Sequence, residues 1–106
     1  MATLLHNITT VLTQDLLTVA DNVNNAKYIS IANVDSTNTA KVDLFLNKGA
    51  NNYYLLKNVE VPIETTLVLT QDDNIAFDNS ANGFSLRIQV DNGSTVAVPV
   101  DVIITK

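Results

Sequence analysis

The chain has 106 residues, the length of one domain, and carries a net charge of −5 with an isoelectric point of about 4.4. Such an acidic chain, with only six scattered basic residues, does not fit a protein that docks on the phosphate backbone of a nucleic acid. Cysteine is absent, which excludes disulfides, thiolate nucleophiles and cysteine-bound zinc.

Neither a targeting segment nor a membrane span is expected. Residues 1–10 lack the basic region that opens a secretory signal peptide, and their apolar run is short. No apolar run elsewhere approaches the length that crosses a bilayer.

The first two apolar segments are short. Residues 3–12 predict a strand, although their apolar spacing is not cleanly that of a strand or a helix. Residues 16–19 also predict a strand because β-branched Thr18 and Val19 are central, and a helix over 14–23 is the competing interpretation.

Residues 27–62 hold three apolar runs separated by Asn, Thr, Ser and Gly, which predicts a β-meander of three consecutive antiparallel strands. Residues 35–40 have the length of an ordinary hairpin loop. Residues 53–61 fit either one bent strand or two short ones before Pro62. In the first run one buried and one more polar face are predicted, because Ile29, Ile31 and Asn33 alternate with Tyr28, Ser30 and Ala32.

The second half continues in the same way. Residues 65–70 and 75–77 predict short strands on either side of an acidic turn, and residues 84–90 alternate without a break and predict a half-buried strand. Asn92 and Gly93 predict a tight hairpin that leads into a last strand over 96–105. Pro99 cannot donate a ladder hydrogen bond, so we expect this strand at a sheet edge or with a bulge.

Eight or nine short strands at this spacing predict an all-β fold. Since no internal repeat or linker interrupts them, we expect one antiparallel β-sandwich or jelly-roll domain over residues 1–106.

Few residues offer catalytic or metal-binding chemistry. His6 is the only histidine and has no acid or nucleophile at a recognisable spacing, so we expect a surface or packing role for it. Residues 72–82 contain carboxylate and amide oxygens that suit Ca²⁺, but Asp and Asn also favour turns. We predict a protein that is not an enzyme and holds no cofactor or metal, with a cation at 72–82 as an open alternative.

The tyrosines allow a different kind of site. Tyr28, Tyr53 and Tyr54, with Asn51 and Asn52, could stack against a sugar and hydrogen-bond it. Tryptophan is absent, which favours packing in the core or in an oligomer interface for these tyrosines instead.

Three stretches carry a resemblance to a known group of proteins: YISIANVDSTNTAKVDLFL at 28–46, YYLLKNVEVPIETTLVL at 53–69, and the turn and strand at 72–77. They resemble small structural proteins of tailed bacteriophages, especially marine and cyanobacterial phages, over most of residues 8–90. The chain departs from that pattern at two turns, where Asp73-Asn74 replaces Gly-Asp and residues 62–64, Pro-Ile-Glu, replace Pro-Ala-Gly.

The resemblance implies a β-sandwich component of a virion. We expect the protein to decorate or cement the capsid surface by binding the major capsid protein and its own copies, with no nucleic acid or membrane partner. A neck, tail or fibre subunit is one alternative, and a module that binds host-surface glycans is another. We expect exposed apolar residues near the two ends of the chain to make the partner contacts, namely Leu4, Leu5, Val96, Val98, Val100, Val102 and Ile104.

Overall fold

The computed structural model describes residues 3–18, 27–70 and 83–105, and these residues form eight strands and no helix. The all-β prediction is confirmed, and the competing helix is wrong for residues 14–17, which form a strand. The strand expected at 75–77 lies outside the described residues. The strands are β1 (Thr3–Ile8), β2 (Gln14–Leu17), β3 (Tyr28–Asn33), β4 (Ala40–Lys48), β5 (Asn51–Val61), β6 (Thr66–Thr70), β7 (Ser85–Asp91) and β8 (Val100–Thr105).

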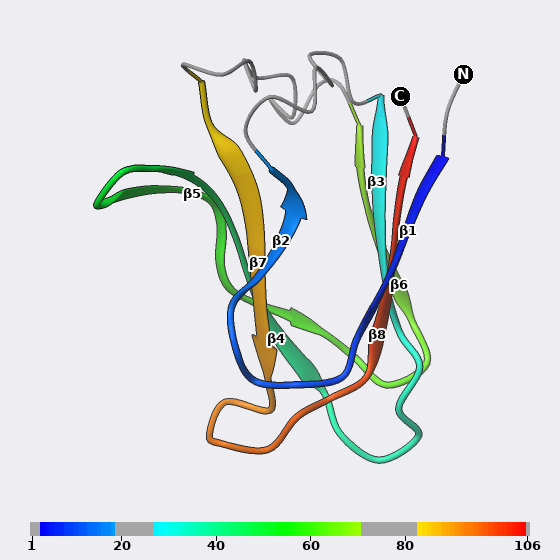
Figure 1. Cartoon of the computed structure of the whole chain (residues 1–106). Coiled ribbons are helices and arrows are strands. Elements are labelled where there is room, and N and C mark those ends of the chain that lie inside the picture. Colours follow the sequence, from blue (N-terminus) through cyan, green and yellow to red (C-terminus); the bar gives the residue numbers. More distant parts are fainter. Residues whose placement is uncertain (1–2, 19–26, 71–82, 106) are drawn as a thin grey trace.

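Two four-stranded antiparallel sheets pack face to face (Figure 1). Sheet A has the order β1-β8-β3-β6 and sheet B the order β2-β7-β4-β5. Strands from the two ends of the chain pair with each other and successive strands follow inward, so that β1 pairs with β8, β2 with β7, β3 with β6 and β4 with β5. A chain folded into four such pairs and rolled into a sandwich is a jelly roll, which confirms the predicted fold class.

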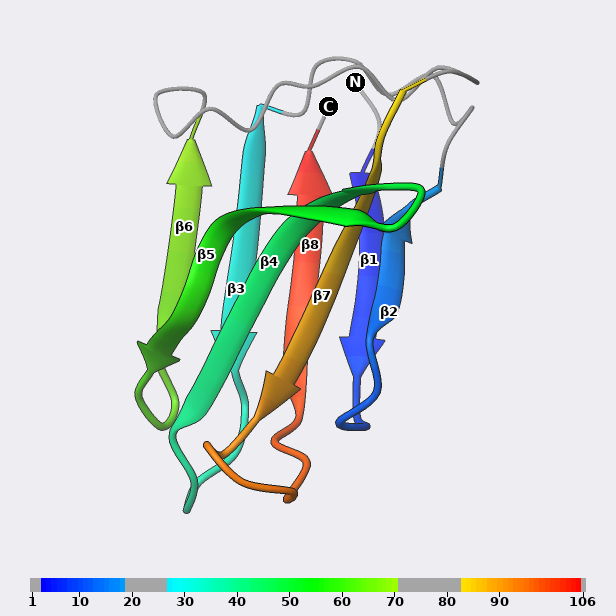
Figure 2. The same cartoon turned by 90° about the vertical axis from the view of Figure 1, so that its left-hand side faces the viewer.

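The predicted meander is wrong in its first half. β3 lies in sheet A, whereas β4 and β5 lie in sheet B, so residues 34–39 cross between the sheets and do not form a hairpin. β4 and β5 do pair as neighbours, and Figure 2 shows their hairpin bending across the outer side of sheet B. The chain therefore changes sheet where local spacing suggested a turn within one sheet.

The hairpin predicted at Asn92 and Gly93 is also wrong. β7 belongs to sheet B and β8 to sheet A, and β8 lies between β1 and β3 rather than at an edge. Pro99 precedes the strand, so its missing N–H interrupts no ladder bond. Gly93 does adopt positive φ, at 91°, within a loop whose Asn92 N–H donates to the Val96 carbonyl oxygen at 3.1 Å.

β5 is a single strand bent by two bulges, which resolves the choice between one bent strand and two short ones. It has 11 residues against 9 in β4, and the pairing shifts on either side of Leu44. At one shift, Lys57 and Asn58 together face Asp43, and Asn58 adopts a φ of 53°. Bulges of this kind bend a strand and raise its twist, which accounts for the curvature of β5 in Figure 2.

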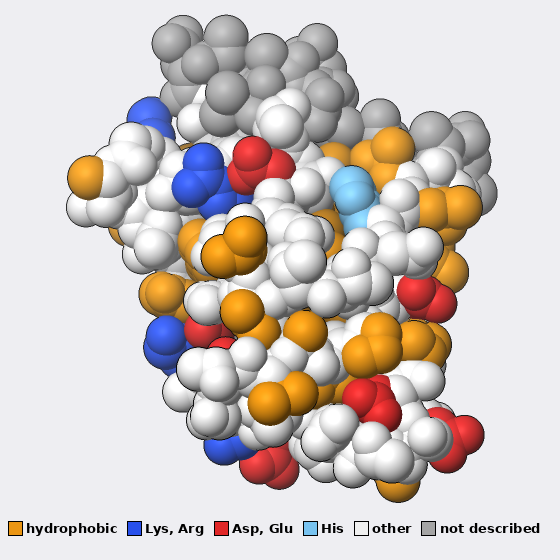
Figure 3. All heavy atoms as spheres, turned by 60° about the horizontal axis from the view of Figure 1, so that its bottom comes forward, with side chains coloured by type: hydrophobic (Ala, Val, Ile, Leu, Met, Phe, Trp, Pro, Cys, Tyr) orange, Lys and Arg blue, Asp and Glu red, His pale blue; other side chains and the backbone are white. Residues whose placement is uncertain are grey.

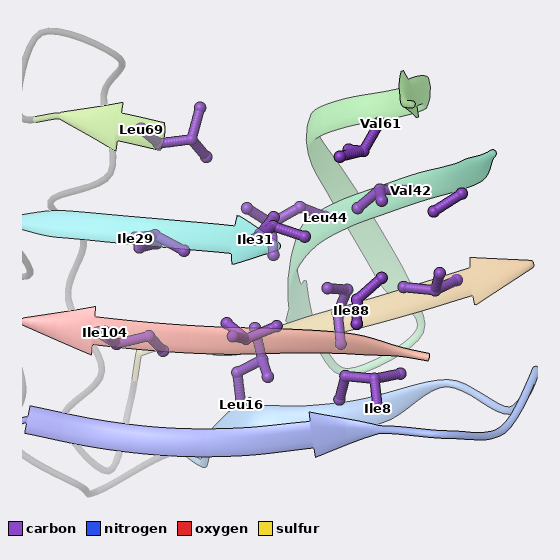
Figure 4. Close-up of a cluster of buried hydrophobic side chains, with 14 of the residues drawn as sticks. Ile8, Leu16, Ile29, Ile31, Val42, Leu44, Val61, Leu69, Ile88 and Ile104 are labelled. Atoms are coloured by element: carbon purple, nitrogen blue, oxygen red, sulfur yellow. The ribbon is translucent and has the colours of Figure 1, made fainter. Parts of the chain in front are cut away.

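The core lies between the sheets and is aliphatic (Figure 4). Every second residue of β3, β7 and β8 points into it, as the alternation predicted. Figure 4 shows Ile29, Ile31 and Ile104 of sheet A facing Val42, Leu44 and Ile88 of sheet B. Asn33 follows the same alternation and is 2% exposed, so one polar side chain is carried into this interior.

Candidate interaction surface

The outward side chains of sheet A form three rows across its four strands. The middle row runs from Leu5 through Ile103 and Ser30 to Val68. Strand register alone brings these residues together, because successive side chains of a strand point to opposite faces. We call the three rows the sheet A face. Its other members are Thr3, Thr105, Tyr28 and Thr70 in one flanking row, and Asn7, Asp101, Ala32 and Thr66 in the other.

The sheet A face has a largely apolar middle row and is nearly free of charge. Leu5 is 71% exposed, Val68 52% and Ile103 40%, and Asp101 is the one ionisable acid or base in the three rows other than the Tyr28 phenol. The outer side of sheet B is different, since the registers of its strands place on it the charged residues Asp15, Lys41, Asp43, Glu60, Arg87 and Asp91. Surfaces that bind other proteins are depleted of charge at their centre, so the sheet A face is the better candidate.

Four of the seven expected contact residues are not exposed, and that expectation is wrong for them. Val98, Val100, Val102 and Ile104 are 0–1% exposed and belong to the core. Their regular alternation reflects the inward face of a central strand. Leu4 is half-buried against the same core, whereas Leu5 on the opposite side of β1 is exposed, as expected.

Val96, the remaining expected residue, is 49% exposed and lies in the loop before β8. It belongs to the end of the sandwich where residues 9–13, 34–39, 62–65 and 92–99 connect strands (Figure 1). Three other exposed aliphatic side chains lie in these loops or beside them: Leu12, Val34 and Ile63. Figure 3 shows hydrophobic side chains scattered over this end between uncharged ones, with acidic side chains among them, rather than gathered in one patch.

The structure separates the three tyrosines that the sequence offered as a sugar platform. Tyr54 lies opposite Phe45 on the outer side of sheet B. Tyr53, the preceding residue of β5, lies opposite Leu46, and Tyr28 lies on the sheet A face. All three are about half exposed, so they do not pack in the core of this domain, and the alternative of an oligomer interface stays a prediction. The Lys57 ammonium lies 4.5 Å from the Tyr54 ring centroid and covers one of its faces.

Two ion pairs lie near the outer side of sheet B. The Arg87 Nε donates to Asp15 Oδ1 at 2.7 Å, and Lys57 Nζ lies 3.5 Å from Asp43 Oδ2. Desolvation by itself lowers the pKa of Lys57, but the negative charge of Asp43 and the contact with Tyr54 outweigh it and raise that pKa above the usual value. An open hollow of about 490 Å³ beside the first pair is lined by Asp15, Arg87 and Lys48, among others.

The described residues contain no cluster of three or more histidine or acidic side chains that could hold a metal ion. His6 lies on β1 with its Nε2 buried and without a hydrogen-bond partner, and it fits the packing role expected of it. The acidic residues at 72–82, the alternative cation site, lie outside the described residues. No described segment is a helix long and apolar enough to span a membrane.

Sequence comparison adds no relative: no protein-family model matches the chain, and no curated protein matches it. The sheet A face is therefore the main functional observation. Sequence reasoning named one of its exposed apolar residues, Leu5, but missed Val68 and Ile103. Val68 is the central outward residue of a strand that contains no charged residue, and this absence of charge was the sequence feature that could have indicated an exposed apolar position.

Proposed function

We propose that the protein is a non-enzymatic structural subunit of a virion, where many copies decorate the capsid by binding the major capsid protein through the sheet A face. The observation that carries the contact surface is the middle row of that face, with three exposed aliphatic side chains and no charge. The placement in a tailed-phage virion rests on the resemblance of residues 28–46 and 53–69.

The jelly-roll fold agrees with this proposal without selecting it. Capsid proteins use the fold, and so do lectins and other binding domains, so the fold alone does not assign a function. Separation of the tyrosines onto different faces weakens the lectin alternative for this chain. An exposed sheet face with little charge suits contact with a broad protein surface, because such contacts gain energy from apolar burial.

Multiple copies make a modest contact sufficient. A stable protein contact commonly buries about 800 Å² on each partner, and repeated copies on a symmetric shell can act with weaker individual contacts when they also touch each other. We therefore place the function in coverage of a surface rather than in one tight complex.

A binding assay on particles that lack the protein tests this proposal. Purified protein is expected to sediment with such particles, and Leu5→Lys combined with Ile103→Lys is expected to weaken binding at least tenfold, because two buried lysines would replace apolar contacts. Lys41→Glu, a charge change on the outer side of sheet B, is the matched control. Equal binding of the double variant and the native chain would contradict the use of this face.

Copy number in the purified particle tests the position. Decoration requires a number of copies comparable to that of the major capsid protein, whereas a neck, tail or fibre subunit is present in few copies. Quantitative mass spectrometry of the particle, with the major capsid protein as internal reference, distinguishes the two, and a low ratio would replace the capsid assignment with the alternative.

A further inference from the structure

We propose that the chain forms a two-fold symmetric dimer in which β6 pairs, antiparallel, with β6 of a second copy. β6 is the last strand of sheet A, and Figure 2 shows it at the outer margin, with no described strand beyond it. Charged residues and proline protect edge strands from pairing with other chains, and the β6 sequence, Thr-Leu-Val-Leu-Thr, has neither. The sequence is also the same in both directions, so two antiparallel copies place like residues opposite each other.

The backbone of β6 has the right orientation for this pairing. Asn33 N–H donates to the Thr65 carbonyl oxygen at 2.9 Å, which continues the β3–β6 register by one position beyond Ala32 and Thr66. Hydrogen-bonded and non-bonded positions alternate along an antiparallel pair, so Leu67 and Leu69 bond to β3. The backbone groups of Thr66 and Val68 therefore point away from β3, toward the open edge.

A two-fold axis at Val68 makes use of these groups. Each Val68 N–H then donates to the Val68 carbonyl oxygen of the other copy, and Leu67 faces Leu69 of the other copy on the inner side. On the outer side, the two Val68 side chains, each 52% exposed in one chain, cover each other. The occupant of this edge is thus a second copy of the same strand.

Charge also favours this edge for contact between copies. Two chains that each carry a net charge of −5 repel each other, so they associate where acidic side chains do not meet. β6 supplies no charged side chain, while β5, the neighbouring edge strand of sheet B, carries Lys57 and Glu60. Thr66–Thr70 is uncharged and self-complementary, so no acidic side chains meet within the strand itself.

The size of the contact predicts how strong the dimer is. β6 has five residues, a length of about 17 Å. A contact confined to so short an edge buries less than the ~800 Å² per partner of a stable complex, so the dimer is weak in dilute solution. It joins two copies of sheet A into one continuous sheet and sets two sheet A faces side by side, which raises the avidity of any surface contact that they make.

Disulfide trapping tests the pairing directly, because the native chain has no cysteine. Residues opposite each other in a hydrogen-bonded antiparallel pair have Cα atoms about 5.5 Å apart, which is within the range a disulfide spans. Under mild oxidation, Val68→Cys is expected to form a covalent dimer at least tenfold faster than Leu5→Cys, a more exposed position on β1 at the other edge of sheet A. Equal rates would overturn the proposal.

A second experiment separates this dimer from the proposed virion role. Sedimentation velocity of the native chain at increasing concentration is expected to show a shift from monomer toward dimer, which Val68→Lys abolishes by placing two like charges at the axis. Ile103→Lys lies on the sheet A face but on β8, two strands away from β6, and is expected to keep the dimer. Native chain and Val68→Lys with the same sedimentation at every concentration would overturn the dimer, whether or not the protein binds particles.

Discussion

Asn33 joins the two sheets through its contact with Val61. The Asn33 Nδ2 donates to the Val61 carbonyl oxygen at 3.0 Å, so the end of β3 in sheet A is tied to the end of β5 in sheet B. The same nitrogen donates to the Asn38 carbonyl oxygen at 2.9 Å, and Oδ1 accepts from Asp35 N–H. One buried amide therefore fixes the crossing between the sheets.

Replacing Asn33 is expected to destabilise the domain strongly. Asn33→Ala leaves two carbonyl oxygens without their donor, and each such loss in the interior costs about 1–3 kcal/mol. Asn33→Asp is expected to cost more, because a buried carboxylate would face those carbonyl oxygens. Urea unfolding measures both, with Asn52→Ala at an exposed position as the control. A loss below about 1 kcal/mol for Asn33→Ala would contradict this role.

The faces of the strands were predictable because alternation is local. Period two along residues 28–33 and 86–90 placed the inward residues correctly, including polar Asn33. The pairing of the strands was not predictable in this way, since the loops at 34–39 and 92–99 are long enough both for a hairpin and for a crossing between sheets. Strand order in a jelly roll depends on contacts between distant segments, and the spacing within each segment does not encode them.

The sheet A face was hidden from sequence reasoning for the same reason. Leu5, Val68 and Ile103 lie far apart in the sequence, each beside other apolar residues that point inward, and only the registers of β1, β8, β3 and β6 set them in one row. The apolar repeat from Val98 to Ile104 is conspicuous in the sequence but faces inward. A run of alternating valines indicates one shared face and leaves open whether that face is the core or the surface.

Adjacent isoleucines of β8 give a direct test of these assignments. Ile104 is fully buried and Ile103 is 40% exposed on the sheet A face. Ile104→Ala is expected to cost about 2–5 kcal/mol because it removes core contacts and leaves a cavity, and Ile103→Ala is expected to cost less than about 1 kcal/mol. Thermal or urea unfolding of the two variants side by side measures the difference. Similar losses would mean that the register of β8 is wrong.

Asp35 makes the stability of the loop between β3 and β4 depend on pH. Its carboxylate accepts from Thr37 N–H at 2.8 Å, from the Thr37 hydroxyl and from Asn38 Nδ2, and these hydrogen bonds, the first above all, hold the pKa of Asp35 below its usual value. A lowered folded-state pKa means that the stabilisation is complete above the unfolded pKa, near 4, and is lost as the pH falls through the folded value.

Comparison with Asp35→Asn isolates that contribution. Native protein is expected to be more stable than the variant at pH 7, with a difference that is constant down to about pH 5 and shrinks at lower pH. Unfolding by urea at a series of pH values measures it, and Asp101→Asn supplies the same change in net charge at another position. A difference that did not change between pH 7 and pH 2 would refute the assignment to the carboxylate.

The bulge at Asn58 offers a test of backbone conformation. Asn58 has a φ of 53°, and its N–H donates to Asp43 Oδ1 at 2.7 Å. A carboxylate on β4 therefore accepts the backbone hydrogen bond of the bulged residue. Asparagine and glycine accept this left-handed conformation, while a β-branched side chain is strained in it. Asn58→Gly is therefore expected to stay within about 0.5 kcal/mol of the native stability and Asn58→Val to lose about 1–3 kcal/mol.

Asp43→Ala completes this test because it removes the acceptor and leaves the backbone geometry without its anchor. Hydrogen exchange of the Asn58 amide is expected to accelerate at least tenfold in that variant, while the amides of Leu44 and Ile88, paired in the centre of sheet B, keep their protection. A strand that is regular at Asn58 would instead tolerate valine, which is well suited to strands, and would show no change in exchange at that amide. If Asn58→Gly is more stable than Asn58→Val, and hydrogen exchange of the Asn58 amide accelerates in Asp43→Ala, both results point to the bulged pairing of β4 and β5.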